Sequence, residues 1–173
     1  MSKLFIIMVG LPARGKSTIA LRLLEAFEAE GVKTRIFNNG ELRRSHLGAD
    51  SSLPDFYHPE NEDGRAKRER LAYVNAMAAK AFMRDGGQIA ILDATNGSPS
   101  RREFLESMFT EAPILYVECV NNNPELIAAS VERKARLPEF SALSREEAIA
   151  GFMERISYYE HIYVPPRGQS CYI

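Results

Sequence analysis

The pattern in this sequence with the clearest chemistry is an octapeptide near its start, Gly10-Leu11-Pro12-Ala13-Arg14-Gly15-Lys16-Ser17. Its two glycines lack bulky side chains, so successive backbone N–H groups of a tight loop can point inward at phosphate oxygens. Lys16 is then placed to reach the outer phosphates of a nucleotide, and the hydroxyl of Ser17 to meet Mg²⁺. The pattern therefore predicts a phosphate loop for ATP and Mg²⁺, formed by the octapeptide together with Thr18.

The residues on both sides of this loop support the prediction. Residues 3–9 form a short apolar run, typical of a strand buried on both faces, that stops at Gly10. After the loop, helical spacing continues as far as Gly31, through Ile19, Ala20, Leu23, Leu24 and Phe27. A helix that starts at the loop directs its partial positive charge at the bound anion. A glycine turn without a ligand is the alternative, but such a turn needs neither Lys16 nor Ser17.

Composition sets the broad class of the protein. The chain has 173 residues, 45% hydrophobic and 26% charged, which fits one domain with a core of ordinary size. The formal net charge of −1 disfavours nucleic acid or a membrane surface as a partner. Cys119 and Cys171 are the only cysteines, and the first lies in an apolar run typical of a buried, reduced thiol. We therefore expect a soluble cytoplasmic protein, with no membrane partner; homo-oligomers remain open.

Segments with strand and helix patterns alternate along the rest of the chain. Further strands are predicted at residues 33–37, 88–93 and 114–120, and helices at 41–47, 63–84, 99–109, 124–134 and 144–161. This order predicts a single domain over residues 1–173 with the three-layer α/β/α P-loop NTPase fold, in which helices cover both faces of a mainly parallel sheet. The polar stretch 48–62 is long for a connection, so we expect a functional loop there.

In such a sheet, ligands bind beyond the carboxyl ends of the strands. Beyond the phosphate loop, the polar segments in that position are Asn38-Asn39-Gly40, Asp93-Ala94-Thr95-Asn96 and Asn121-Asn122-Asn123. Asp93 could hold Mg²⁺, directly or through water, or it could accept the proton of an attacking hydroxyl, and the sequence leaves both roles open. A residue that caps the following helix is the alternative, but Ser98 or Asn96 would serve there as well.

Arginines gather near the same strand ends. Most surface arginines are only solvated, but a second phosphorylated or acidic substrate would need guanidinium donors of its own. The candidates are Arg14, Arg43, Arg44, Arg65, Arg68, Arg70, Arg101, Arg102, Arg133, Arg136 and Arg145. Residues 133–140, which begin Arg-Lys-Ala-Arg, also have the pattern of a basic lid that closes over a transferring phosphate and excludes water. A solvated helix end is the alternative.

Several motifs occur in an order that is specific to one family. They are the octapeptide, Phe37-Asn-Asn-Gly40 with Glu41-Leu-Arg43-Arg44, the stretch from Phe56 to Gly64, and Leu92-Asp-Ala-Thr-Asn96 with Arg101-Arg102. In these motifs the chain resembles the kinase domain of the bifunctional 6-phosphofructo-2-kinase/fructose-2,6-bisphosphatase family. The likeness covers nearly the whole chain, and its most specific parts are the Pro-Ala-Arg of the phosphate loop and Glu-Asn-Glu-Asp-Gly at 60–64.

The resemblance implies a small-molecule kinase that transfers the γ-phosphate of ATP to the 2-hydroxyl of fructose 6-phosphate. Lys16 and Ser17 would hold ATP and Mg²⁺, and Asp93 would act near the metal and the sugar hydroxyl. Lys134 is similar to the family's lysine beside the transferring phosphate, where an added cation opposes the charge on the phosphoryl oxygens. The residues expected to grip the sugar phosphate are Arg43 or Arg44, Arg68, Thr95, Arg101 or Arg102, and Arg145.

The sequence also departs from the family. The helix before Lys134 is one residue shorter, so Arg133 or Arg136 could take its place, and Phe140 replaces a usual tyrosine and its hydroxyl. The chain ends before the phosphatase domain, so we expect no phosphatase activity in it, and part of the family's sugar-phosphate site lies in the missing segment.

Two hypotheses of other classes stay open. One is a kinase of a nucleic-acid hydroxyl, which the negative charge and the lack of aromatic residues within a basic stripe disfavour. The other is an ATP-binding module without catalysis, which leaves the presence of Asp93, Thr95 and Lys134 unexplained.

Overall fold

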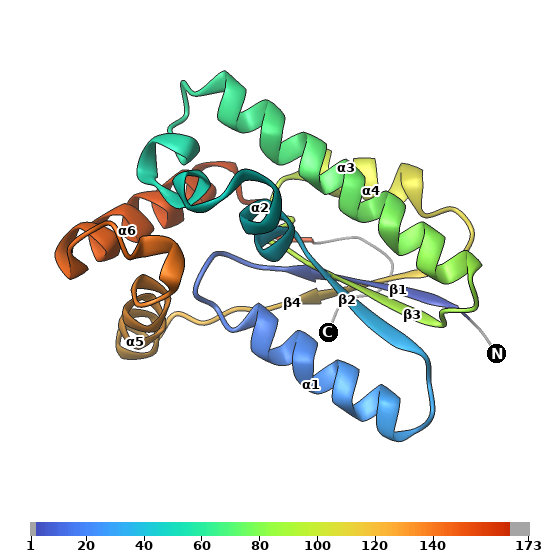
Figure 1. Ribbon diagram of the computed structural model, residues 1–173. Helices are drawn as coiled ribbons and strands as arrows, with labels where there is room; N and C mark the ends of the chain where they lie inside the picture. The colour runs from blue at the N-terminus through green and yellow to red at the C-terminus, as the bar shows by residue number, and fades with distance from the viewer. Residues whose placement is uncertain (1–2, 167–173) are drawn as a thin grey trace.

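The structure is a computed structural model that describes residues 3–166, so Cys171 and the chain end lie outside the described part. At its centre is a parallel sheet with the strand order β2-β3-β1-β4 (Figure 1). The strands are β1 (Leu4–Val9), β2 (Thr34–Asn38), β3 (Ile89–Asp93) and β4 (Ile114–Glu118). The inner strands β1 and β3 are almost wholly buried, because helices cover both faces of the sheet.

The helices begin and end close to the positions that the sequence predicts. They are α1 (Lys16–Ala29), α2 (Asn39–Leu47), α3 (Glu62–Arg84), α4 (Pro99–Met108), α5 (Pro124–Ala135) and α6 (Arg145–Ile162). Short 3₁₀ helices lie between them: η1 (Ala49–Ser52), η2 (Pro54–Tyr57) and η3 (Pro138–Phe140). Between residues 3 and 166, none of the helices has both the length and the apolar character that crossing a membrane requires.

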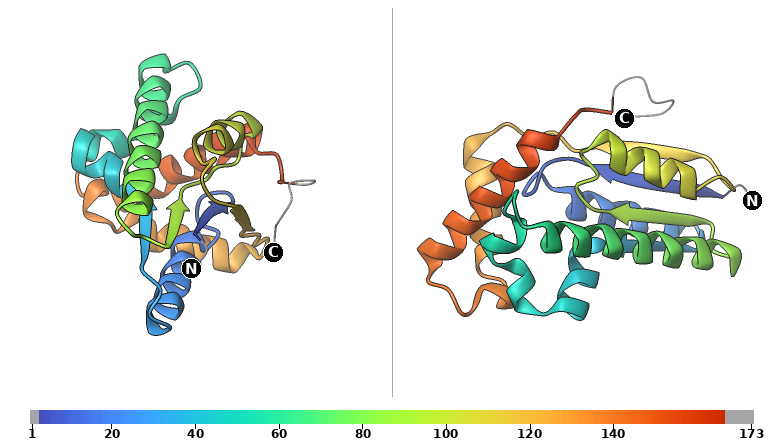
Figure 2. Two further views of the ribbon diagram at one scale, coloured as in Figure 1. Left: turned by 90° about the vertical axis from the view of Figure 1, so that its right-hand side faces the viewer. Right: turned by 90° about the horizontal axis from the view of Figure 1, so that it is seen from above.

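The side chains of β1 alternate between two apolar clusters, one on each face of the sheet. Phe5, Ile7 and Val9 belong to the cluster under α3 and α4, whereas Ile6 and Met8 belong to the cluster over α1. Figures 1 and 2 show the same division, with α3 and α4 on one side of the sheet and α1 on the other. The predicted three-layer α/β/α architecture is confirmed.

Helices α5 and α6 lie beyond the carboxyl ends of the strands and pack against each other there (Figure 2). They share a separate apolar cluster that includes Val131, Phe140, Phe152 and Ile156. The rings of Phe140 and Phe152 meet edge to face, with centroids 6.4 Å apart. Phe140 is therefore a core residue whose ring has little contact with solvent.

The polar stretch 48–62 is folded back onto the rest of the molecule as η1 and η2. Ser51, Ser52 and Tyr57 are buried although the stretch is polar overall. The stretch packs so closely on α6 that a Cβ atom at Gly151 would lie 2.6 Å from the Cγ atom of Pro54. The predicted loop thus packs against α2 and α6.

Candidate active site

The predicted phosphate loop connects β1 directly to α1. Ala13 (φ 61°) and Gly15 (φ 86°) have left-handed backbones, which turn the loop toward the helix. A Cβ atom at Gly10 would lie 2.6 Å from the carbonyl oxygen of Cys119, so only glycine fits beside the end of β4. Within the described residues, no side chain caps the start of α1, which leaves its first N–H groups available to an anion. The loop therefore has the shape of an anion-binding turn.

Lys16 is buried at the base of this loop. Its Nζ atom donates a hydrogen bond of 2.7 Å to the carbonyl oxygen of Leu11. Burial lowers the pKa of Lys16 to about 8, and the negative charge of Asp93 opposes that shift. A buried ammonium group in this position gains stability when an anion binds next to it.

Asp93 ends β3 and is 4% exposed. Its Oδ2 atom accepts a hydrogen bond of 2.6 Å from Nδ2 of Asn38, the residue opposite it on β2. Ser98, and not Asp93, caps α4, because its hydroxyl accepts the hydrogen bond of the Arg101 amide. Asp93 and Ser17 line the same cavity, and a carboxylate with a hydroxyl is a donor set that suits Mg²⁺.

That cavity, which we call the phosphate-loop cavity, has a volume of about 210 Å³. Its charged lining residues are Arg14, Lys16, Arg44, Arg133, Lys134 and Arg155, with the carboxylates of Asp93 and Glu139. Burial lowers the pKa of Lys134, and the positive charges of Arg155 and Arg44 lower it further. Positive groups outnumber carboxylates, so the cavity suits the phosphates of a nucleotide.

A second cavity of about 120 Å³, the α3–α6 cavity, lies beside the first. Its charged and aromatic lining residues are Arg43, Tyr57, Arg68, Glu69, Arg101, Arg155, Tyr158 and Tyr159. The guanidinium carbon of Arg155 lies 4.3 Å from the ring centroid of Tyr57, and that of Arg68 lies 5.1 Å from the ring centroid of Tyr158. The Nε atoms of Arg101 and Arg155 are buried and have no hydrogen-bond partner among residues 3–166. The Nη2 atom of Arg101 pairs with Glu69 Oε1 at 2.5 Å. This cavity therefore combines arginine side chains, two of them with an unpartnered Nε atom, with aromatic rings.

The two cavities share part of their lining, including Thr95 and Arg155. The Thr95 carbonyl oxygen also accepts a hydrogen bond of 3.1 Å from the amide of Gly10, which joins the loop after β3 to the phosphate loop. The sequence motifs described above give no role to Arg155. The signal that could have found it is its spacing of three and four from Tyr158 and Tyr159, which puts all three on one face of α6.

Two predicted substrate residues, Arg102 and Arg145, line neither cavity. Arg102 is buried, and its Nη1 atom donates to the carbonyl oxygens of Asn96 (3.1 Å) and Gly97 (3.0 Å). Arg102 therefore holds the loop that carries Thr95.

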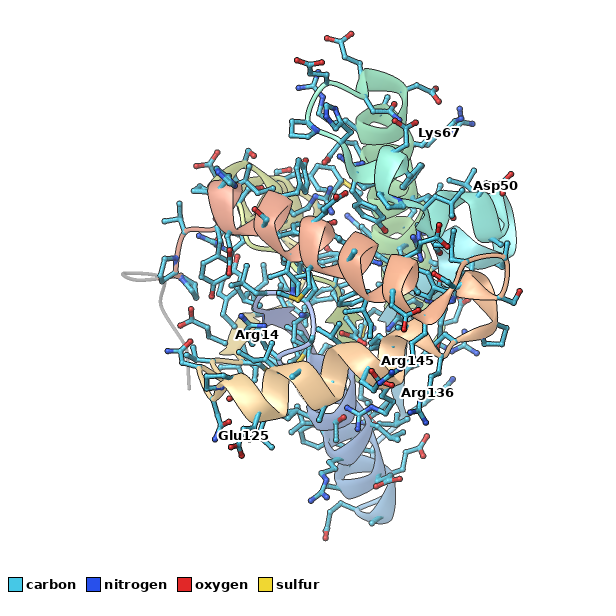
Figure 3. All side chains as sticks on the ribbon, turned by 90° about the vertical axis from the view of Figure 1, so that its left-hand side faces the viewer. Arg14, Asp50, Lys67, Glu125, Arg136 and Arg145 are labelled. Atoms are coloured by element: carbon cyan, nitrogen blue, oxygen red, sulfur yellow. The ribbon has the colours of Figure 1, made fainter. Side chains whose placement is uncertain are left out.

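Arg145 lies on the outer side of α6, where its Nε atom is 2.7 Å from Glu132 Oε1. Arg136, the alternative to Lys134, also pairs with Glu132. Figure 3 shows Arg136 and Arg145 together at one end of the α5–α6 pair, away from Arg14. Of the alternatives to Lys134, only Arg133 lines the phosphate-loop cavity.

Solved structures with a similar fold include the crystal structure of APE1195. It aligns over 99% of this chain and 85% of its own, with a TM-score of 0.61 and 18% sequence identity. A variant of the Mycobacterium tuberculosis APS kinase CysC aligns over 90% of this chain and 98% of its own, with a TM-score of 0.50 and 16% identity. At these identities the likeness is one of fold.

Sequence comparison identifies the family. The family model described as 6-phosphofructo-2-kinase matches residues 1–170. The Homo sapiens protein 6-phosphofructo-2-kinase/fructose-2,6-bisphosphatase 3 is 36% identical over 170 residues, which cover 96% of this chain and 32% of that protein. The Rattus norvegicus protein 6-phosphofructo-2-kinase/fructose-2,6-bisphosphatase 4 is 36% identical over 162 residues, covering 91% of this chain and 34% of that protein. This chain thus spans about a third of the length of these curated relatives, and it belongs to the 6-phosphofructo-2-kinase family.

Proposed function

We propose that this protein is an ATP-dependent kinase that transfers the γ-phosphate of ATP to the 2-hydroxyl of fructose 6-phosphate. The observation that carries the proposal is the pair of adjoining cavities that share Thr95 and Arg155. One is built on a phosphate loop, and the other presents arginines and tyrosines, as a phosphorylated sugar requires. Family membership supports the choice of acceptor. The buried free thiol of Cys119 fits a reducing, cytoplasmic setting.

In the phosphate-loop cavity, the loop amides and Lys16 would bind the ATP phosphates. Mg²⁺, held by Ser17 and Asp93, would supply charge that offsets the phosphate oxygens. The Oδ2 atom of Asp93 accepts a hydrogen bond from Asn38, so the Oδ1 atom would bind the metal or accept the proton of the acceptor hydroxyl. Lys134 lines the cavity where it can oppose negative charge on the transferring group. Residues of the α5–α6 connection would exclude water from the reaction.

In the α3–α6 cavity, Arg68, Arg101 and Arg155 would bind the phosphate of the sugar. Arg101 is favoured over Arg102 because Arg101 lines this cavity, where it pairs with Glu69, whereas the guanidinium group of Arg102 holds backbone carbonyls and lines neither cavity. The tyrosine rings would cover the apolar faces of the sugar ring. Thr95 lies where the two cavities adjoin, so its hydroxyl can contact the acceptor close to Asp93.

A panel of acceptors tests the proposal. ATP consumption above the blank is measured with phosphorylated sugars, nucleosides and oligonucleotides, and we expect turnover with fructose 6-phosphate. Lys16→Ala and Asp93→Ala, checked for folding by circular dichroism, should each lower kcat/KM on the order of 100-fold or more. Arg68→Ala should raise the KM for fructose 6-phosphate more than the KM for ATP. Turnover confined to oligonucleotides, or ATP binding with no turnover on any acceptor, would contradict the proposed function.

A further inference from the structure

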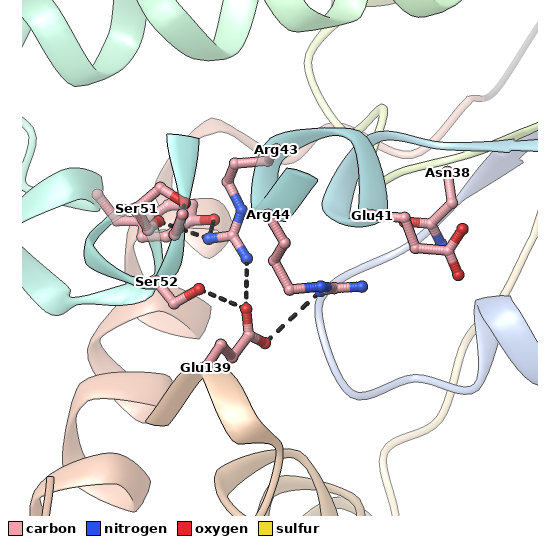
Figure 4. Close-up of polar contacts among 9 residues, drawn as sticks. Asn38, Glu41, Arg43, Arg44, Ser51, Ser52 and Glu139 are labelled. Carbon is pink, nitrogen blue, oxygen red and sulfur yellow. Dashed lines mark hydrogen bonds and ion pairs between the residues drawn. The ribbon is translucent and has the colours of Figure 1, made fainter. Parts of the chain in front are cut away.

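A buried carboxylate between the two cavities has no role in the chemistry described so far. Glu139 lies in η3, within the lid segment of residues 133–140, and its side chain is 5% exposed. Its Oε2 atom is 2.9 Å from Nη2 of Arg43 and also accepts a hydrogen bond from the hydroxyl of Ser52. Its Oε1 atom is 3.6 Å from Nη1 of Arg44. Figure 4 shows that one carboxylate thus joins two arginines of α2 to η1.

The two arginines line different cavities. Consecutive residues of a helix point about 100° apart, and accordingly Arg43 lines the α3–α6 cavity while Arg44 lines the phosphate-loop cavity. Glu139 meets both side chains and itself lines the phosphate-loop cavity. The Glu139 carboxylate of the lid segment therefore forms an ion pair with one arginine from each cavity.

The Arg43 guanidinium group is held on several sides. Its Nη1 atom donates to the carbonyl oxygen of Ser51 (2.5 Å) and to the hydroxyl of Tyr57 (2.6 Å), and its side chain is 4% exposed. A buried cation without a counter-ion is costly, and Glu139 is the carboxylate that pairs with it. The contact with Arg44 is longer, and the Arg44 side chain is 37% exposed. Glu139 therefore constrains Arg43 more strongly than Arg44.

We propose that Glu139 is a positioning residue that fixes Arg43 in the wall of the α3–α6 cavity and ties the lid segment, with Lys134, to that wall. The assignment deepens the proposed function and rests on it for the identity of the acceptor. Glu139 touches no reacting group in this scheme and acts through Arg43. Loss of its charge should weaken binding of the phosphorylated acceptor and misplace Lys134, while the phosphate loop itself is unchanged.

The test compares Glu139→Gln, Glu139→Asp and the matched control Glu132→Gln. Glu132 lies seven residues before Glu139 and also accepts hydrogen bonds from two arginines, but it lines neither cavity. Glu139→Gln should raise the KM for fructose 6-phosphate about tenfold and lower kcat, as small displacements of binding groups do. The dissociation constant of ATP, measured by calorimetry, should stay within about twofold. Glu139→Asp should recover part of the loss, and Glu132→Gln should match the wild type.

An unchanged KM for the acceptor in Glu139→Gln, an equal loss of ATP affinity, or an equal effect of Glu132→Gln would overturn the assignment. If Glu139→Gln does not fold, Ser52→Ala removes one hydrogen bond to the same carboxylate oxygen and should raise the acceptor KM about threefold. No change in that variant would also overturn it. The proposed function is tested separately, by the turnover of fructose 6-phosphate by the wild type alone. If the wild type turns over another phosphorylated acceptor instead, the ratio of the KM of each variant to that of the wild type is measured with that acceptor.

Discussion

Glu132 and Glu139 are seven residues apart, and each pairs with two arginines. Glu132 lies among exposed side chains, whereas Glu139 lies in the interior of the protein. Glu132, on α5, accepts hydrogen bonds from Arg136 and Arg145 at the outer end of the α5–α6 pair. Glu139, in η3, accepts from Arg43 and lies near a second arginine of α2. The arginines around Glu132 are 72% and 61% exposed, whereas Arg43 is 4% exposed. The same pairing is thus made once in solvent and once in the interior.

The difference lies in what each pair connects and in what its loss would leave behind. Glu132 pairs with Arg136, four residues along the chain, and with Arg145 at the start of α6. Both arginines are exposed, so water can replace either partner at little cost. Glu139 pairs with Arg43, which is 96 positions away in the sequence. Removing the Glu139 carboxylate leaves the Arg43 guanidinium group buried where water does not reach it. Only the buried pair can therefore hold the lid segment to the cavity wall.

The largest effect should come from breaking the buried pair. Glu139→Gln is expected to lower the free energy of unfolding by about 3–5 kcal/mol, because it leaves Arg43 buried without a counter-ion. Urea denaturation followed by circular dichroism measures the loss, with Glu132→Gln as the control. A loss no larger than that of the control would show that the two pairs differ in exposure but not in energy.

A smaller effect should follow when both partners are removed. The double variant Arg43→Met with Glu139→Gln should be more stable than the sum of the single losses predicts, with a coupling of about 1–3 kcal/mol. The physical reason is that no uncompensated charge remains in the interior. The same denaturation experiment on the two single variants and the double variant gives the coupling. Additive losses would mean that Glu139 and Arg43 act independently.

The sequence accounts for most of the fold. It does not account for the exposed pair, because the family resemblance assigns Arg145 to the sugar phosphate and offers Arg136 as an alternative to Lys134, whereas both arginines pair with Glu132. Apolar runs that stop at Gly10 or at Asp93 predict the inner strands, and the structure has both strands within one residue of these ends. The helix Arg145–Ile162 begins after Ser144, whose capping box with Glu147 is legible as Ser-x-x-Glu in the sequence. These signals are local, since each depends on residues within one or two turns of one another.

The buried pair has no local signal. Residues 133–140 read as a basic lid because Arg133, Lys134 and Arg136 dominate the pattern, and nothing near Glu139 shows that its partner is Arg43. For the same reason, neighbouring arginines could not be told apart: Arg101 lines a cavity and Arg102 holds a loop, a choice made by the packing of α4. The roles of these residues in binding stay predictions.

The smallest effect should come from the exposed pair, and its dependence on pH is distinctive. Hydrogen bonds from Arg145 and then Arg136 lower the pKa of Glu132 from its ordinary value of 4.5. A carboxyl group whose pKa is lower in the folded state stabilises the protein above the unfolded-state value and loses that contribution as the pH falls through the folded-state value. The difference in Tm between the wild type and Glu132→Gln should therefore be small at about pH 7 and vanish as the pH falls below 4.5 and through the folded-state pKa, and salt should reduce it. A difference in Tm that is insensitive to salt and as large as that for Glu139→Gln would mean that exposure does not determine how much each glutamate contributes to stability.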